Sequence, residues 1–298
     1  MKLLFFPSDL GGGFGHISRC LAVAHEAVRR KHHCAFVINT RKFESQINTD
    51  FTTFVSQRSR TPSFVRSLFK RVIGQVYSRK SPLFTEISSL DYQVIRDGLS
   101  DTGRIKKNIA RYLHIIDTFH PDLLIGDTNL LVWILSQITH IPVVQIVRYA
   151  SHPQTAHLLW WKNEPDSLVP PDSSALFNPL LHAMGLSSIK RATDLLQGDR
   201  YIVPSLPEIE PIPDDGKTFF VGALTRSIAN NNVPPWFQEI DNDRPLVYIT
   251  LGGGAGPVGN TLFFATILET FADKAVQVIV STSSKFDATD LPVAPPHI

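Results

Sequence analysis

A glycine-rich segment that ends in histidine lies near the start of the chain. Residues 11–16 read Gly-Gly-Gly-Phe-Gly-His, between an apolar run that predicts a strand at 2–7 and a helical pattern at 17–31. A glycine turn from strand to helix gathers backbone N–H groups and a helix N-terminus, which favours an anion. Histidine is the side-chain type most often used as a general base, so His16 is a candidate for that role. The segment therefore predicts proton transfer beside an anionic ligand.

A histidine base works best when a carboxylate binds its far ring nitrogen, fixes its tautomer and stabilises the imidazolium. Asp127 follows an apolar run at 123–126, which predicts a buried strand, and strand ends of open α/β sheets line the ligand cleft. We therefore expect Asp127 to pair with His16 in catalysis. The alternative is that both side chains only cap helices, since Asp is a favoured N-cap and precedes a predicted helix at 129–139.

A second glycine turn lies near the other end of the chain. Residues 246–251 predict a strand, 252–256 read Gly-Gly-Gly-Ala-Gly, and 261–271 predict a helix. Main-chain N–H groups of such a turn can reach a diphosphate, although a tight turn without a ligand is the alternative. The first glycine segment does not match G-x-G-x-x-G, which disfavours an NAD site. The residues predicted to bind such a diphosphate ligand are Gly13, Gly15, Thr250, Gly252, Gly253 and Gly254.

Strand and helix patterns alternate along the chain, which predicts an α/β fold with parallel sheets. Besides the elements above, we expect strands at 34–39, 122–126, 142–147 and 276–281 and helices at 63–78 and 103–119. Residues 151–185 predict loops and short helices around a cleft. The predicted domains are residues 1–225 and 244–298, joined by a linker at 226–243. About 55 residues are few for a domain, so we expect the second domain to be incomplete.

Composition restricts the class of protein. Of the 298 residues, 43% are hydrophobic and 19% charged, with a net charge of +2. These values favour a folded core and give no case for a nucleic-acid partner. The cysteines, Cys20 and Cys34, are expected to be free thiols in a reducing cytoplasm. The longest apolar stretch, 130–147, is too interrupted to span a bilayer.

Three further groups are candidate binding residues. Arg148 and His152 follow a predicted strand end, where open α/β sheets bind their ligands, so they are expected to line a ligand pocket. Residues 63–80 predict a basic amphipathic helix that contacts the inner face of a membrane or an acidic acceptor, with an ordinary packed helix as the alternative. Asp241-Asn-Asp243 has the D-x-D spacing of a metal site, but its polar setting favours a solvated turn, so no metal is expected.

Several segments together resemble the GT-B glycosyltransferases of the UDP-glycosyltransferase and MurG-like group. They occur in the family's order and cover nearly the whole chain: residues 13–22, 121–127, 201–208, 220–224 and 245–252. The resemblance implies two Rossmann-type domains: an acceptor-binding domain at 1–225, with Arg148 and His152 in its acceptor pocket, and the start of a donor domain at 244–298, which is incomplete. It also implies that the predicted diphosphate-binding residues are donor-binding residues. The family holds the donor mainly through a later "HGG…E" segment, which this sequence does not contain.

The resemblance implies metal-independent transfer of a sugar from a nucleoside diphosphate sugar, expected to be a UDP-sugar, to a hydroxyl of a small-molecule or lipid-linked acceptor. His16 would be the base, Asp127 would orient it, and no cofactor is expected. One alternative is a nucleotide-sugar hydrolase, because residues 15–21 also resemble such a family. Another is a non-catalytic acceptor-binding half that needs a separate donor-binding subunit.

The second domain is expected to leave apolar surface uncovered. The predicted helix at 261–271 can cover only one face of strands 246–251 and 276–281. We therefore expect the other face to expose Val247, Ile249, Val278 or Val280 unless the first domain or a partner covers it, and we expect weak or no binding of a UDP-sugar by this chain alone.

Overall fold

The chain divides into two compact units. Unit 1 comprises Met1–Gly11 and Gly15–Arg226, and unit 2 comprises Ser227–Ile298 with Gly12–Phe14. This division is close to the predicted boundary at residue 225, while the roles assigned to the two domains remain predictions. The computed structural model describes residues 1–9, 14–56, 90–91, 94, 99, 101–155, 172–225, 233–250, 261–281 and 293.

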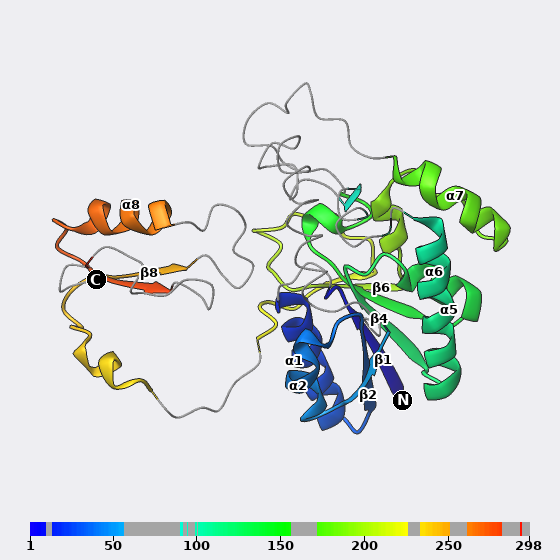
Figure 1. Cartoon of the computed structure of the whole chain (residues 1–298), viewed down its shortest axis with the longest axis horizontal. Helices are drawn as coiled ribbons and strands as arrows, with labels where there is room; N and C mark the ends of the chain where they lie inside the picture. Colours follow the sequence, from blue (N-terminus) through cyan, green and yellow to red (C-terminus); the bar gives the residue numbers. More distant parts are fainter. Residues whose placement is uncertain are drawn as a thin grey trace, which may run out of the picture. The chain divides into compact units, whose positions relative to one another are not determined.

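Unit 1 is built on a parallel sheet whose seven described strands run in the order β3-β2-β1-β4-β5-β6-β7 (Figure 1). The sheet therefore grows outward from β1 in both directions, as in doubly wound nucleotide-binding folds. This architecture confirms the predicted α/β class. The strands are β1 (Lys2–Pro7), β2 (His33–Ile38), β3 (Thr52–Val55), β4 (Leu123–Asp127), β5 (Val143–Ile146), β6 (Arg200–Val203) and β7 (Thr218–Phe220).

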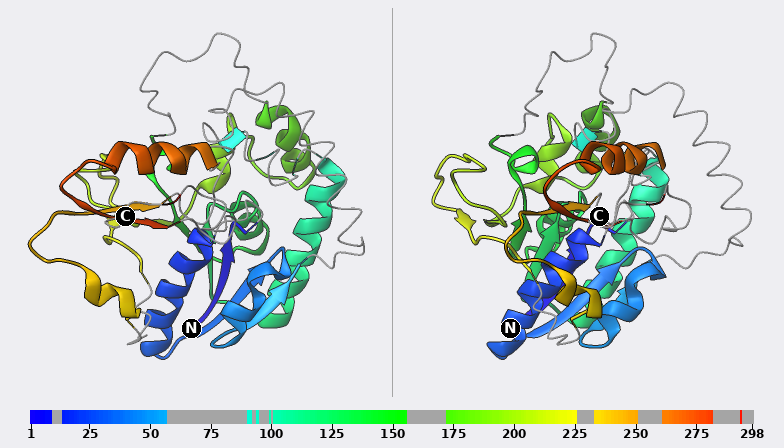
Figure 2. Two further views of the ribbon diagram at one scale, coloured as in Figure 1. Left: turned by 60° about the vertical axis from the view of Figure 1, so that its left-hand side comes forward. Right: turned by 90° about the vertical axis from the view of Figure 1, so that its left-hand side faces the viewer.

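Apolar side chains cover both faces of this sheet because successive residues of a strand point to opposite sides. In β1, Leu3 and Phe5 join the core under α1, whereas Leu4 and Phe6 join the larger core under α5 and α6. Figure 2 shows α1 and α5 on opposite sides of the sheet. The helices of unit 1 are α1 (Gly15–Arg29), α2 (Glu44–Asn48), α5 (Thr102–Phe119), α6 (Val132–Thr139) and α7 (Ser173–Ala183), with short 3-10 turns at Arg41–Phe43, Tyr149–Ser151 and Ala192–Leu196.

Helix α6 begins three residues later than predicted. The side-chain oxygen of Asn129 accepts the backbone N–H of Leu131 at 3.2 Å, and Leu131 precedes the helix without a side-chain cap. An Asn side chain that binds a nearby backbone N–H competes with helix formation. The residues after β4 therefore form a turn, which leaves Asp127 clear of the helix.

Five helices and strands of unit 1 were not individually predicted: β3, β6, β7, α2 and α7. The three strands are short, with four, four and three residues. Helix α7 has 11 residues and contains Pro179, in a stretch predicted as loops and short helices. Its start is defined by Asp172, whose carboxylate accepts the N–H of Ala175 at 3.0 Å.

Unit 2 pairs β8 (Leu246–Thr250) with β9 (Gln277–Ser281) in parallel, beside helix α8 (Thr261–Phe271) and a 3-10 turn at Pro235–Glu239. All three regular elements agree with the predicted ranges to within one residue. The expectation about exposed side chains was wrong in its details. Leu246, Tyr248 and Thr250 are the exposed members of β8, whereas Val247 and Ile249 are partly covered and Val278 is buried. Exposed and covered residues therefore alternate along β8 as expected, but the exposed positions are those that the sequence analysis predicted to be covered.

Candidate functional site

The carboxyl end of β4 and the first turn of α1 bring three side chains together in unit 1. Asp127 is the last residue of β4 and pairs in register with Pro7 of β1. Helix α1 begins at Gly15, so His16 and Arg19 lie one turn apart on the same face of its N-terminal end. The predicted pairing of His16 with Asp127 is therefore present, and Arg19 is added to it.

The cluster is held by short polar contacts. The Nδ1 atom of His16 lies 2.8 Å from Oδ1 of Asp127. Arg19 donates from Nε to Oδ2 at 2.9 Å and from Nη2 to Oδ1 at 2.8 Å, so its guanidinium binds both carboxylate oxygens. Thr128 donates its hydroxyl to Oδ1 at 3.2 Å. A carboxylate with this many donors is held in one orientation.

Burial and charge oppose each other at Asp127. Its side chain has no exposed surface, whereas those of His16 and Arg19 are 30% and 21% exposed. Burial is the largest single influence and would raise the pKa of Asp127, but the hydrogen bonds and charges of His16 and Arg19 together outweigh it and lower that pKa. For Arg19, the carboxylate likewise outweighs burial and raises the pKa of the guanidinium. The carboxylate is therefore ionised at neutral pH.

This arrangement is suited to accept a proton at one atom. When Nδ1 of His16 carries its hydrogen, it donates to Asp127, and Nε2 then has a free lone pair. A positive charge that develops on the imidazole lies next to a buried anion. A group with these properties can act as the general base for a hydroxyl or a water molecule.

The geometry also decides between pairing and capping for Asp127. Both of its oxygens bind side chains from α1 and Thr128, and α6 begins at Val132. The capping alternative for Asp127 was therefore wrong. The carboxylate binds side chains of α1 rather than the N-terminus of α6, the helix that follows β4 in the chain.

Most of the predicted donor-binding residues lie outside the described part of the chain: Gly13, Gly252, Gly253 and Gly254. Gly15 is the first residue of α1, and Thr250 is the last residue of β8 and is exposed. Their roles stay predictions. The predicted basic helix at 63–80 also lies outside the described residues.

The predicted acceptor-binding residues Arg148 and His152 have partners within unit 1. The Nε of Arg148 donates to Glu210, whose other oxygen accepts the N–H of Tyr149 at 2.6 Å. His152 is fully buried, its Nε2 lies 3.0 Å from Oγ1 of Thr218, and burial lowers its pKa. These are the contacts of structural residues, and a role of either side chain in acceptor binding stays a prediction.

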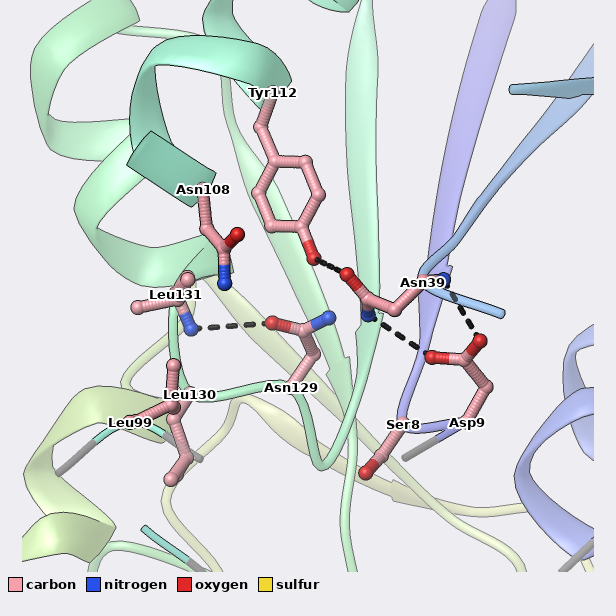
Figure 3. Close-up of a pocket in the computed structure, with 9 residues that line it drawn as sticks. All are labelled: Ser8, Asp9, Asn39, Leu99, Asn108, Tyr112, Asn129, Leu130 and Leu131. Atoms are coloured by element: carbon pink, nitrogen blue, oxygen red, sulfur yellow. Dashed lines mark hydrogen bonds between the residues drawn. The ribbon is translucent and has the colours of Figure 1, made fainter. Parts of the chain in front are cut away.

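A second polar cluster lies at the ends of β1 and β2 and was not predicted. The carboxylate of Asp9 accepts the N–H of Asn39 at 2.7 Å, its side-chain amide at 2.9 Å and the N–H of Thr40 at 2.7 Å. The hydroxyl of Tyr112 donates to Asn39 Oδ1 at 2.7 Å (Figure 3). The cluster borders a cavity of about 20 Å³, room for about one water molecule. Polar residues directly after apolar strands were a signal that pointed to Asp9 and Asn39.

Two structural features bear on metal and membrane binding. Within the described residues, no three His, Cys, Asp or Glu side chains form a group that could hold a metal ion. In the D-x-D segment, the carboxylate of Asp241 accepts the N–H of Asp243 at 2.9 Å, within a turn. No helix in the described part of the chain is both long and apolar enough to cross a membrane.

Comparison with characterised proteins identifies related sequences. The chain is 26% identical over 250 residues to a PGL/p-HBAD biosynthesis glycosyltransferase of Mycobacterium tuberculosis, covering 75% of this chain and 56% of the relative. It is 26% identical over 209 residues to a PGL/p-HBAD biosynthesis rhamnosyltransferase of Mycobacterium bovis, covering 63% and 45%. A third relative from that species is described as an inactive PGL/p-HBAD biosynthesis glycosyltransferase, at 25% identity. The chain thus spans about half the length of these relatives. No protein-family model matches it.

Solved structures of similar fold cover nearly all of the chain. A glycosyltransferase of kitacinnamycin superposes with a TM-score of 0.63 at 16% identity, covering 99% of this chain and 68% of the other. A calicheamicin glycosyltransferase superposes with a TM-score of 0.62 at 18% identity, with the same coverage. A spinosyn rhamnosyltransferase, solved with thymidine diphosphate, gives a TM-score of 0.56 at 15% identity. The chain therefore has the GT-B glycosyltransferase fold and is similar in sequence to glycosyltransferases.

Proposed function

We propose that this chain forms the acceptor side of a glycosyltransferase that moves a sugar from a nucleoside diphosphate sugar to an acceptor hydroxyl. The observation that supports it most is the 2.8 Å contact between His16 Nδ1 and a buried, ionised Asp127. That contact leaves Nε2 of His16 as a base on a side chain that is 30% exposed. The names of the relatives support the same class of reaction.

The reaction then follows from the cluster. The acceptor oxygen attacks the anomeric carbon and forms the glycosidic bond as the bond from that carbon to the diphosphate breaks. The nucleoside diphosphate leaves with the electron pair of the broken bond, and the acceptor proton passes to Nε2 of His16. Asp127 stabilises the imidazolium that results. The predicted glycine turns would bind the diphosphate through main-chain N–H groups.

The nucleotide and the acceptor are open to experiment. The sequence favours a UDP-sugar, while solved proteins of similar fold were crystallised with thymidine diphosphate. The relatives are named for PGL/p-HBAD biosynthesis. We therefore propose that a UDP-sugar and a dTDP-sugar each be tried as the donor, and that each donor be combined with an alcohol acceptor and with a phenol acceptor. One relative is described as inactive, so turnover itself has to be measured.

Product analysis with labelled UDP-glucose and dTDP-rhamnose tests this proposal. It is done on the 298-residue chain and on the longest reading frame that contains it. We expect label in a glycoside of the acceptor, and we expect His16→Ala to lower kcat by about 10²–10⁴, the range for loss of a general base. Binding of the nucleotide sugar, measured by calorimetry, should change little.

Other outcomes would contradict the proposal. Free sugar as the sole labelled product would indicate the hydrolase alternative. Binding of acceptor without turnover in either protein would indicate a non-catalytic half. Unchanged kcat in His16→Ala would remove His16 from the chemistry.

A further inference from the structure

Arg19 is the residue of the cluster to which the proposed reaction assigns no role. It lies one helical turn after His16, and its guanidinium binds both oxygens of Asp127 at 2.8 and 2.9 Å. Within the described residues, Oδ2 of Asp127 receives its one hydrogen bond from Arg19, whereas Oδ1 is shared by His16, Arg19 and Thr128. Without Arg19, a fully buried oxygen would lose that partner.

Two neutral tautomers of His16 are possible in this cluster, with the hydrogen on Nδ1 or on Nε2. The Nη2 atom of Arg19 lies 2.8 Å from Nδ1 of His16, the same distance that separates Nδ1 from Oδ1 of Asp127. If Nδ1 carries the hydrogen, it donates to Asp127 and Nε2 is free to act as a base. If Nδ1 is bare, it accepts from Arg19, the hydrogen is on Nε2, and His16 cannot take a proton there.

The charge of Asp127 separates these two forms. An ionised Oδ1 at 2.8 Å attracts an N–H and repels a nitrogen lone pair, so it favours the form with Nδ1 protonated. A neutral carboxyl group would lose this preference, because its own O–H could donate to a bare Nδ1. A guanidinium bound to both oxygens favours the ionised carboxylate and fixes its plane.

We propose that Arg19 is a positioning residue: it holds Asp127 ionised and in plane, and thereby selects the tautomer of His16 in which Nε2 is the base. This inference rests on the proposed function for its effect on turnover. Its effect on the tautomer is a property of the chain without substrate.

The test uses Arg19→Met, which keeps the length of the side chain without its charge, and Arg19→Lys, which keeps the charge without the two-pronged guanidinium. Arg29→Met is the matched control, because Arg29 is on the same helix and binds the exposed Glu26 through Nε and Nη2 at 2.7 Å. Tautomers are read from the ring-nitrogen signals of ¹⁵N-histidine, with the His16 signal assigned from its loss in His16→Ala. Circular dichroism checks folding.

We expect Nδ1 of His16 to be protonated in the wild-type chain and in Arg29→Met, and Nε2 to be protonated in Arg19→Met, with Arg19→Lys intermediate. In whichever of the two proteins shows turnover, the 298-residue chain or the product of the longest reading frame that contains it, we expect Arg19→Met to lower kcat about 10- to 100-fold and to leave KM unchanged. Loss of a residue that orients a metal-binding histidine through a hydrogen bond has an effect of this size. Arg29→Met should keep the wild-type kcat.

The Arg19 proposal is overturned if folded Arg19→Met keeps the wild-type tautomer, or if neither Arg19 variant folds, since Arg19 would then be structural. If Arg19→Met alone fails to fold, the tautomer in Arg19→Lys decides. The tautomer shift without any glycosyl transfer by the wild-type protein would support the role of Arg19 and contradict the proposed function, so the two failures are distinguishable.

Discussion

Unit 1 contains two buried aspartates after neighbouring strands, and their partners differ in kind. Asp127, at the end of β4, is bound by an imidazole and a guanidinium. Asp9, just after β1, is bound by two backbone N–H groups and a side-chain amide. Both carboxylates are at least nine-tenths buried. Similar burial at the same edge of one sheet has therefore produced two different environments.

The comparison shows that the partners of a buried carboxylate, rather than its burial, decide what it can do. The amide donors around Asp9 cannot accept or release a proton at ordinary pH, so this cluster joins β1, β2 and α5 into one structure. Around Asp127, His16 can exchange a proton and is partly exposed. We therefore expect substitutions at Asp127 to affect turnover most and substitutions at Asp9 to affect stability most.

The largest expected effect is the loss of turnover in Asp127→Asn. The amide has no charge and one acceptor oxygen, so His16 loses the partner that fixes its tautomer. We expect kcat to fall about 10²–10⁴-fold, comparable to loss of the base itself. Steady-state product analysis on the folded variant measures it. Asp9→Asn is the control, and an equal fall in kcat for both would abolish the distinction between the clusters.

The next effect is on stability. In Asp9→Asn, one side-chain oxygen replaces two, and the new NH₂ group faces the N–H donors of Asn39 and Thr40. Leaving a buried donor without an acceptor costs about 1–3 kcal/mol of unfolding free energy. Urea unfolding followed by circular dichroism measures the change. If the midpoint of unfolding lies at the same urea concentration in Asp9→Asn as in the wild type, the Asp9 cluster contributes little to the stability of the fold.

A smaller loss of stability is expected in Tyr112→Phe. This substitution keeps the buried ring and removes the hydroxyl that donates to Asn39 at 2.7 Å. Loss of one such hydrogen bond costs about 0.5–1.5 kcal/mol. The same urea experiment measures it. A double variant with Asp9→Asn should lose less than the sum of the two single losses if both side chains act through Asn39.

The smallest effect should appear only in acid. Because the pKa of Asp127 is lower in the folded chain than its ordinary value of 3.8, the ionised carboxylate favours the folded state. This contribution is fully present above the ordinary value and is lost as the pH falls through the lower, folded pKa. Melting temperatures at about pH 6 and about pH 3 should therefore differ less in Asp127→Asn than in the wild type. An identical difference in both chains would contradict this linkage.

Local patterns predicted most of the framework of unit 1. Apolar runs bounded by turn residues identify β1, β2, β4 and β5, and helical periodicity identifies α1 and α5, because both signals depend on neighbours in the chain. The strands β3, β6 and β7 were missed because each has only three or four residues and begins with a polar one, whereas the equally short β5 belongs to a longer, mainly apolar run at 142–147. Their pairing with the sheet, rather than local preference, makes them strands.

The candidate site likewise has features that local sequence patterns predict and features that they do not. The local sequence pattern alone placed His16 in the first turn of a helix and Asp127 at the end of a buried strand, so their meeting at one edge of a parallel sheet was predictable. No local pattern predicted that Arg19 binds both oxygens of Asp127, 108 residues away, or that Asn39 links Asp9 to Tyr112, which is 73 residues from Asn39; these contacts follow from the packing of α1 and α5. The physical reason is that strand ends follow from local pattern, whereas the partner of a buried charge depends on which side chains the packed helices bring within hydrogen-bonding distance.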